Sequence, residues 1–359
     1  MKRITFITLT LMHSIILFSQ EKENKVNPFD FSGSYVGDCL GNMYGGLNNG
    51  AAFLGMANIS LSFSTQKANW WNGGVLYING CNTHRISPND ELFGDFQTLC
   101  NIDADETTFL HEFWYSQRTN NLEFIIGIQD LNKNFASSDN GSLFINSSFG
   151  IPSVISNNIP APIFPCTRFG LSMIWNINNE ISWLGSAYDV SDGILSITEI
   201  QFQTNFFNHL GKYKVGTYAF NSHESPKRIN NYGIYAIADQ TLWKESEEKR
   251  IEMFTQVSIS PKRINEHYLY LGGGINFYGL IDNRAIDSFG LAIANARLSE
   301  RNNSNRIYRN ETAIELYYNY NITENISIQP DLQYIISPCG SEDVLENCFA
   351  GILRLKIEF

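Results

Sequence analysis

The chain has 359 residues, a net charge of −11 and 43% hydrophobic residues, with 25 Phe and 17 Tyr against 10 Pro. This length suits one large domain. The acidic balance disfavours nucleic acid as a partner, because phosphate binding needs clustered Lys and Arg. Beyond the N-terminus there is no run of 18 or more apolar residues, which excludes membrane-spanning helices.

Residues 1–20 resemble an export signal. Two basic residues open the chain and an apolar stretch follows as far as Phe18, which is the arrangement of a secretory signal. The segment does not end in a small-x-small pattern, so the cleavage point stays open, and no Cys lies near it to suggest a lipoprotein. We expect a signal peptide at 1–20 and one domain at 21–359. The remaining acidity fits a cation-favouring channel or ordinary surface solubility.

Amphipathic runs of about ten residues alternate with turns along the rest of the chain. Within each run apolar and polar residues alternate with period two, which is typical of a β-strand that is wetted on one face. No stretch shows a helical period. The sixteen expected strands are 34–40, 53–64, 70–81, 107–119, 122–132, 167–178, 181–191, 195–204, 211–221, 232–243, 251–260, 266–279, 287–299, 311–322, 326–337 and 349–359.

The connections between these strands alternate in length. The long ones are 82–106, 133–166, 222–231, 300–310 and 338–348. Short turns at one end and long loops at the other are typical of outer-membrane barrels. A closed barrel is also the one way for strands to satisfy their backbone groups in lipid. The sequence therefore predicts an all-β fold, a single 16-stranded antiparallel transmembrane β-barrel with short periplasmic turns and long external loops.

The connection 133–166 differs from the others. Loops longer than about 12–15 residues without regular structure are uncommon and usually functional. Apolar residues recur along this one, which a disordered linker would not show; they are Phe144, Ile145, Phe149, Ile151, Ile163 and Phe164. We predict that it folds inward against the barrel wall as a constriction.

An even number of cysteines in an exported chain suggests disulfides. Cys81 with Cys100, and Cys339 with Cys348, are each placed to close one external loop, which leaves Cys39 with Cys166. Cys81-x-x-His84 could instead begin a metal site, but a lone C-x-x-H is a weak signal. We expect no metal and no other cofactor.

Several stretches share a family pattern. They are GSYVGDCLGNMYGGLNNGAAFLGMANISLSF, LHEFWYSQRTNNLEFIIGIQDLNKNF, FINSSFGIP, RAIDSFGLAIANARLS and ETAIELYYNYNITENISIQPDLQYIISPCG. Together they resemble the carbohydrate-selective porins of Gram-negative outer membranes. The likeness covers most of the mature chain and is patchy between about residues 195 and 250. It implies a sixteen-stranded barrel that passes small sugars by diffusion and is narrowed by inward-folded loops. The cysteines depart from the family pattern, and the sugar preference stays open.

Strand alternation assigns side chains to the lumen. The expected pore-lining residues are Glu112, Trp114, Arg118, Glu123, Gln129, Arg168, Glu311, Glu315, Tyr317, Asp331, Gln333 and Arg354. The same register places Phe109, His111 and Phe113 on the lipid face. A filter for sugars needs donors, acceptors and aromatic surfaces that replace water without tight binding. For any single charged residue, however, pairing across the barrel to hold its shape is the expected role.

Catalytic signals are weak. Glu311 and Glu315 could suggest the paired carboxylates of a glycosidase, but on one strand they are neighbours along a wall. G-x-S-x-G, P-loop and H-E-x-x-H motifs are absent, and a barrel lipase is disfavoured because His111 is expected to face lipid. We predict a passive outer-membrane porin for small carbohydrates, and not an enzyme. The alternatives are a general or cation-preferring porin and a surface scaffold or adhesin with a plugged lumen. Both a monomer and a trimer remain open.

Overall fold

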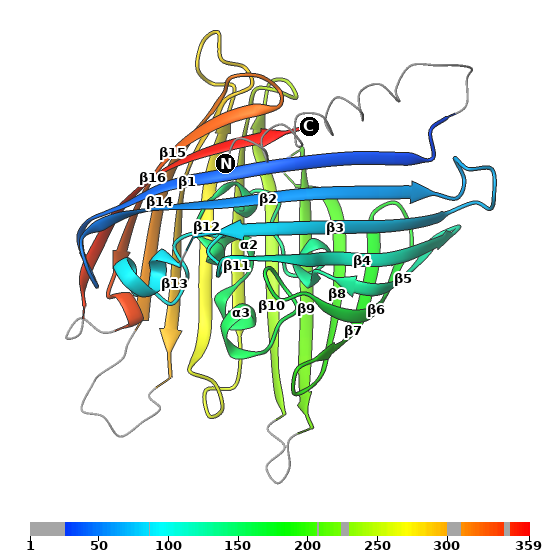
Figure 1. Cartoon of the computed structure of the whole chain (residues 1–359), viewed down its shortest axis with the longest axis horizontal. Coiled ribbons are helices and arrows are strands. Elements are labelled where there is room, and N and C mark those ends of the chain that lie inside the picture. Colours follow the sequence, from blue (N-terminus) through cyan, green and yellow to red (C-terminus); the bar gives the residue numbers. More distant parts are fainter. Residues whose placement is uncertain (1–25, 86, 207, 224–229, 300–309, 341–344) are drawn as a thin grey trace, which may run out of the picture.

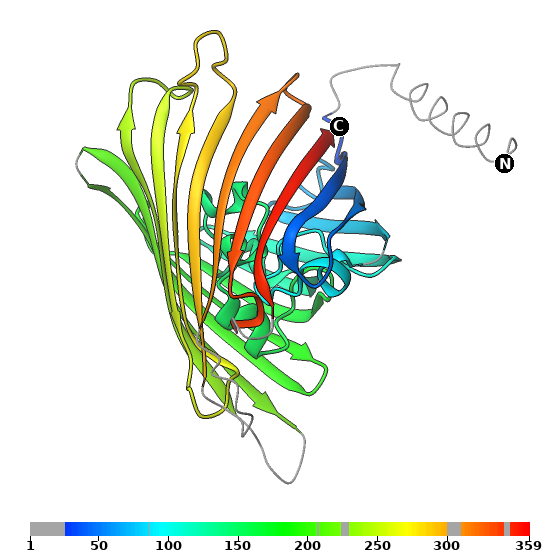
Figure 2. The same ribbon diagram turned by 90° about the vertical axis from the view of Figure 1, so that its left-hand side faces the viewer.

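The computed structural model describes residues 26–85, 87–206, 208–223, 230–299, 310–340 and 345–359. The expected signal peptide at 1–20 lies outside these residues. Sixteen antiparallel strands form a closed barrel in which each strand pairs with its sequence neighbours and β1 pairs with β16 (Figures 1 and 2). The predicted all-β, sixteen-stranded fold is therefore confirmed.

The observed strands lie close to the expected runs. They are β1 (Phe29–Gly46), β2 (Gly50–Ser64), β3 (Gly74–His84), β4 (Thr107–Thr119), β5 (Leu122–Gln129), β6 (Arg168–Asn176), β7 (Ile181–Val190), β8 (Gly193–Phe206), β9 (His209–Ser222), β10 (Asn231–Lys244), β11 (Arg250–Ile259), β12 (His267–Tyr278), β13 (Ser288–Leu298), β14 (Asn310–Asn321), β15 (Ile326–Ile336) and β16 (Glu346–Glu358). The largest difference is in β1, which is longer than the expected 34–40 because both β2 and β16 pair with it along most of its length.

The helices are short and all lie in connections. They are η1 (Asn89–Phe93), η2 (Leu131–Lys133), η3 (Gly141–Leu143), α2 (Ser147–Gly150), α3 (Ser153–Asn158) and η4 (Pro338–Gly340). In the described part of the chain, none of the helices has the length and hydropathy needed to cross a membrane.

The five predicted long connections all leave the same end of the barrel. They lie between β3 and β4, β5 and β6, β9 and β10, β13 and β14, and β15 and β16. We call this the loop end. The opposite end, which we call the turn end, holds the tight connections 120–121, 177–180 and 322–325. This asymmetry agrees with the architecture expected from the sequence.

The outer face of the barrel is a continuous apolar surface. Exposed apolar residues recur on this face of the strands, and six that are 46–56% exposed are Ile59, Ile126, Leu171, Ile234, Ile293 and Leu353. Large aromatic residues are exposed near the turn end, among them Trp70, Trp71, Trp175 and Trp243. An apolar band edged by aromatic residues is the surface that a barrel presents to a bilayer.

The prediction that Phe109 and His111 face lipid is wrong. The register between β3 and β4 shifts after Asn79, because Asn79 pairs with Glu112 but Gly80 pairs with Leu110. This bulge leaves His111 unpaired, and an extra residue reverses the alternation on one side of it. Leu110 is therefore exposed on the outer face, whereas His111 is buried and lies 3.4 Å from the Asp130 carboxylate. Phe113, beyond the bulge, faces outward as predicted.

The bulge predicts a specific pattern of lipid exposure. A spin label at Leu110→Cys should collide with oxygen dissolved in the bilayer, because this position faces outward. A label at the adjacent His111→Cys should be shielded from oxygen. Continuous-wave electron paramagnetic resonance in reconstituted vesicles measures both. The bulge assignment would be wrong if His111→Cys were the more oxygen-accessible of the two.

Candidate functional site: a lumen narrowed by two anchored loops

The connection between β5 and β6 folds into the barrel. We call residues 130–167 the L3 loop, and Figures 1 and 2 show its helices α2 and α3 inside the ring of strands. Phe144 and Phe149 are almost fully buried, and the Phe144 ring lies 4.9 Å from that of Tyr317 and 5.6 Å from that of Phe254. The predicted inward folding of 133–166 is therefore confirmed, and apolar packing against the inner wall is its cause.

Small residues on the inner wall make room for this packing. A Cβ atom at Gly290 would lie 2.9 Å from the Phe144 ring, and one at Gly274 would lie 2.6 Å from the Phe254 ring. Ala292 and Ala294 continue the inner face of β13 and are buried. The position of the L3 aromatic residues thus depends on glycine and alanine in β12 and β13.

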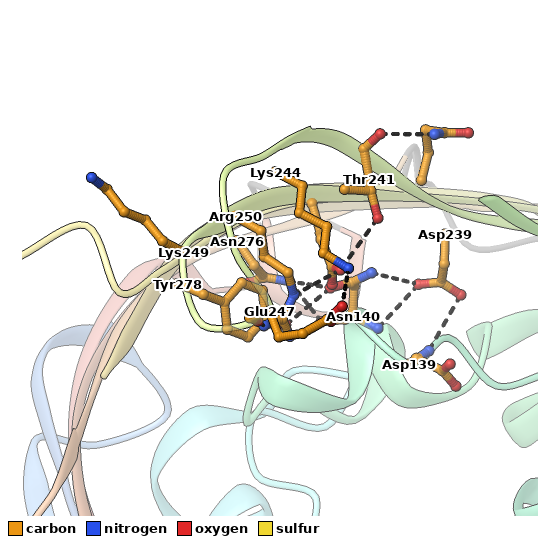
Figure 3. Close-up of polar contacts among 12 residues, drawn as sticks. Asp139, Asn140, Asp239, Thr241, Lys244, Glu247, Lys249, Arg250, Asn276 and Tyr278 are labelled. Atoms are coloured by element: carbon orange, nitrogen blue, oxygen red, sulfur yellow. Dashed lines mark hydrogen bonds and ion pairs between the residues drawn. The ribbon is translucent and has the colours of Figure 1, made fainter. Parts of the chain in front are cut away.

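Asp239 on β10 holds the middle of L3. Its carboxylate accepts hydrogen bonds from Ser138 Oγ at 2.6 Å, the Asn140 backbone N–H at 3.0 Å and Asn140 Nδ2 at 3.2 Å. Asn140 in turn accepts from Asn276 Nδ2 at 3.0 Å and from Tyr278 Oη at 3.1 Å (Figure 3). L3 is therefore bonded to both β10 and β12.

Two further wall carboxylates bind the L3 backbone. Glu315 on β14 accepts from the backbone N–H groups of Ile145 at 2.5 Å and Asn146 at 2.9 Å. Glu199 on β8 accepts from the backbone N–H of Ala136 at 2.9 Å. Buried backbone N–H groups need partners, and these wall carboxylates supply them.

A second loop also enters the lumen. We call residues 85–106, between β3 and β4, the L2 loop. Glu311 on β14 accepts from the backbone N–H groups of Phe96 and Gln97, each at 3.0 Å. Where β16 meets β1, Arg354 binds both oxygens of Asp38 at 2.7–2.8 Å and donates to Asn101 Oδ1 of L2 at 2.8 Å.

The twelve predicted pore-lining residues all lie at inward-facing positions, but many are covered. Six are at most 3% exposed, namely Gln129, Glu311, Glu315, Tyr317, Asp331 and Gln333. They hold loops and neighbouring side chains, as Gln333 does by donating to the Leu99 carbonyl at 3.0 Å. They do not line the free surface of the lumen in this structure, because the loops lie over them.

The other six predicted residues are more varied. Glu112 is buried and accepts from Trp114 Nε1 at 3.2 Å, and Arg354 is mostly buried at the junction of β1 and β16. Arg168 donates to Ser191 Oγ at 2.9 Å. Trp114, Arg118, Glu123 and Arg168 keep part of their surface exposed. Contact of any of them with a sugar stays a prediction.

The sequence reasoning missed Asp239 and Glu199, which both contact L3. The sequence of β10 contains a signal for such a loop contact. Tyr235 and Ile237 occupy inner-face positions of β10 beside Asp239, yet they are apolar and buried. Apolar residues on a lumen face indicate that something covers them, and a carboxylate beside them indicates an anchor.

The structure contains none of the predicted disulfides, and all six cysteines are free. The thiol of Cys100 donates to Asp38, that of Cys348 to Asn42, and that of Cys339 to the Gly94 carbonyl. Cys39 is exposed on β1, whereas Cys166 lies two residues before β6, on another part of the wall. Cys81 is buried on the inner side of β3. No cluster of three or more His, Cys, Asp or Glu suited to a metal ion occurs within the described ranges.

Removing the Asp239 anchor should loosen L3. In Asp239→Ala the N–H of Asn140 and the hydroxyl of Ser138 lose their acceptor, at a cost of about 1–3 kcal/mol for each unsatisfied group. We expect higher and noisier single-channel conductance, together with faster proteolysis within L3. Asp189→Ala, at an exposed position on β7, is the control. Unchanged conductance and proteolysis would contradict the anchoring role.

Asp95 of L2 should make loop docking depend on pH. Burial raises the pKa of its carboxyl well above the ordinary value, and the neighbouring Glu311 carboxylate acts in the same direction. Such a group disfavours the docked state increasingly as pH rises above the unfolded-state pKa. Asp95→Asn should therefore raise the thermal unfolding temperature at pH 8, and the gain should vanish below about pH 4, where Asp is protonated in both states. Tryptophan fluorescence of the detergent-solubilised protein measures this. An equal gain at both pH values would refute the titration of Asp95 as its cause.

Comparison with known proteins identifies the family to which this barrel belongs. The family model described as "Carbohydrate-selective porin, OprB family" matches residues 48–215 and 200–359. Porin B of Pseudomonas aeruginosa is 25% identical over 146 residues, which is 35% of this chain and 32% of that protein. The match thus spans about a third of the length of this curated relative.

Solved structures show the same fold. A high-pH structure of Pseudomonas putida OprB superposes with a TM-score of 0.84 at 18% identity, over 92% of this chain and 94% of that one. A loop-deletion mutant of Vibrio cholerae OmpT gives a TM-score of 0.56 at 8% identity, over 92% and 99% of the two chains. The family model covers nearly all of the barrel from β2 onward. The chain belongs to the carbohydrate-selective porin (OprB) family.

Proposed function

We propose that this protein is a passive diffusion channel for small carbohydrates in the outer membrane of a Gram-negative cell. The observation that supports this most directly is the arrangement of L3. It bonds to the strands from β8 to β15 through residues such as Glu199, Asp239 and Glu315. Opposite, several inner side chains of β2 to β4 keep part of their surface exposed; they include Met56, Asn58, Ser60, Tyr77 and Trp114. A narrowed passage along β2 to β5 is the route that we assign to solute.

The inward-facing charges of the barrel favour neutral solutes. Arg118 pairs with Glu123 at 2.5 Å, and Lys212 with Asp139 at 2.5 Å. Arg250 pairs with Glu252 at 2.9 Å and lies over the Tyr278 ring at 3.8 Å (Figure 3). Paired charges offer donors and acceptors without a strong field of one sign, and a polyhydroxylated solute can exchange its water for such groups.

The runner-up functions rest on two observations. The net charge of −11 favours a cation-preferring porin. The extensive burial of L2 and L3 favours a scaffold or adhesin whose lumen is plugged. The bilayer lipids are the partner of the apolar outer face in all three cases.

Two measurements on the purified, reconstituted protein separate the candidates. We expect liposome swelling in glucose, and a small zero-current potential in a KCl gradient because the lumen charges are paired. A large cation-selective potential without sugar-driven swelling would indicate an ion channel instead. Absence of both conductance and swelling would indicate the plugged scaffold. Protein-free liposomes and heat-denatured protein are the controls.

A further inference from the structure

An aromatic pair on the inner wall remains partly exposed although L3 fills much of the lumen. Tyr77 of β3 and Trp114 of β4 are cross-strand neighbours, with ring centroids 4.9 Å apart and planes inclined by 25°. Other inward aromatic residues, such as Tyr235, Tyr270 and Tyr317, are at most 1% exposed. Tyr77 and Trp114 instead remain partly exposed. Coverage by L3 therefore accounts for the burial of the other inward aromatic residues, but it does not give a role for Tyr77 and Trp114.

On β5, the residue opposite Trp114 has no side chain. Its cross-strand neighbour on β5 is Gly127, which has a φ of 137°. A Cβ atom there would lie 2.2 Å from the Phe113 carbonyl oxygen and 2.6 Å from Trp114 Cα. Gly127 pairs in turn with Gly170 of β6. Positive φ and close backbone contact both require glycine at 127, so no side chain of residue 127 lies beside Trp114.

Polar groups stand on both sides of Trp114 along the inner face of β4. Toward the loop end, Glu112 accepts the hydrogen bond of the indole N–H at 3.2 Å. Toward the turn end, Arg118 is 63% exposed although it is paired with Glu123. An aromatic surface thus lies between a carboxylate acceptor and a guanidinium donor.

We propose that Tyr77 and Trp114 form a stacking platform for the ring of a pyranose sugar in transit, with the exposed Arg118 of the Arg118–Glu123 pair bonding its hydroxyls and the buried Glu112 holding the indole in place. The proposal rests on the function proposed above and names a contact site within it. A pyranose has a face of C–H groups and a rim of hydroxyls. The C–H face can lie on an aromatic ring while the rim reaches charged groups that flank it. A single platform binds weakly, as a diffusion channel requires.

The test compares a ring sugar with an open-chain polyol in single-channel recordings. Glucose and sorbitol carry similar hydroxyl groups, but sorbitol lacks the flat ring face. In Trp114→Leu the glucose concentration that half-blocks the ion current should rise roughly fivefold to tenfold, the loss of about 1 kcal/mol of stacking. The value for sorbitol should change much less. Trp114→Phe should restore most of the glucose affinity, and Tyr77→Leu should weaken it in the same direction.

Controls separate this proposal from the function on which it rests. Trp175→Leu, which removes an exposed tryptophan of the outer face, should leave both half-blocking concentrations unchanged. Equal losses for glucose and sorbitol, or no loss in Trp114→Leu and Tyr77→Leu, would overturn the platform while leaving a sugar channel intact. A wild-type channel that conducts ions but admits no sugar would overturn the proposed function itself. Unchanged KCl conductance identifies the variants that fold correctly, and Tyr77→Leu decides the matter if Trp114→Leu does not.

Discussion

Backbone groups that enter the barrel with a loop must find new hydrogen-bond partners, and the rest of the inner structure follows from this constraint. Strand pairing satisfies the wall, but the N–H groups of L2 and L3 have left water. Carboxylates that project inward from β8, β10 and β14 accept them. A buried carboxylate is costly alone, and several N–H donors together offset that cost. Most inward acids thus serve the loops and not the solute.

The inner wall consequently has two arcs, which differ in how far their side chains are covered by loops. Along β8 to β15 it carries anchoring carboxylates, small residues and buried aromatic rings, all matched to the surface of L3. Along β2 to β5 several polar and aromatic side chains, such as Asn58, Tyr77 and Trp114, stay partly exposed beside others that are buried. The charged residue types are the same on both arcs. The two arcs differ in whether a loop covers the charged side chains. A covered side chain binds the loop, whereas an uncovered one faces the solute.

Strand alternation predicted the number of strands and the inward orientation of the predicted residues between Glu112 and Arg354, and the lengths of the connections predicted the two ends of the barrel. The alternation failed at His111, because a bulge depends on how two strands pair and leaves no mark in the period of one strand. It could not tell that Glu315 is covered, since the covering residue Ile145 is 170 positions away in sequence. The cysteine pairing failed for a similar reason: loop length and an even count of thiols do not fix where each thiol points.

The contact between Arg354 and Asn101 has a consequence for how the protein is made. Arg354 belongs to the last strand, and its partners Asp38 and Asn101 come from the first strand and from L2. L2 cannot complete these contacts before the final segment of the polypeptide has been added to the sheet. During biogenesis L2 therefore completes its docking only after the barrel has closed, and the lumen reaches its final width at that last step.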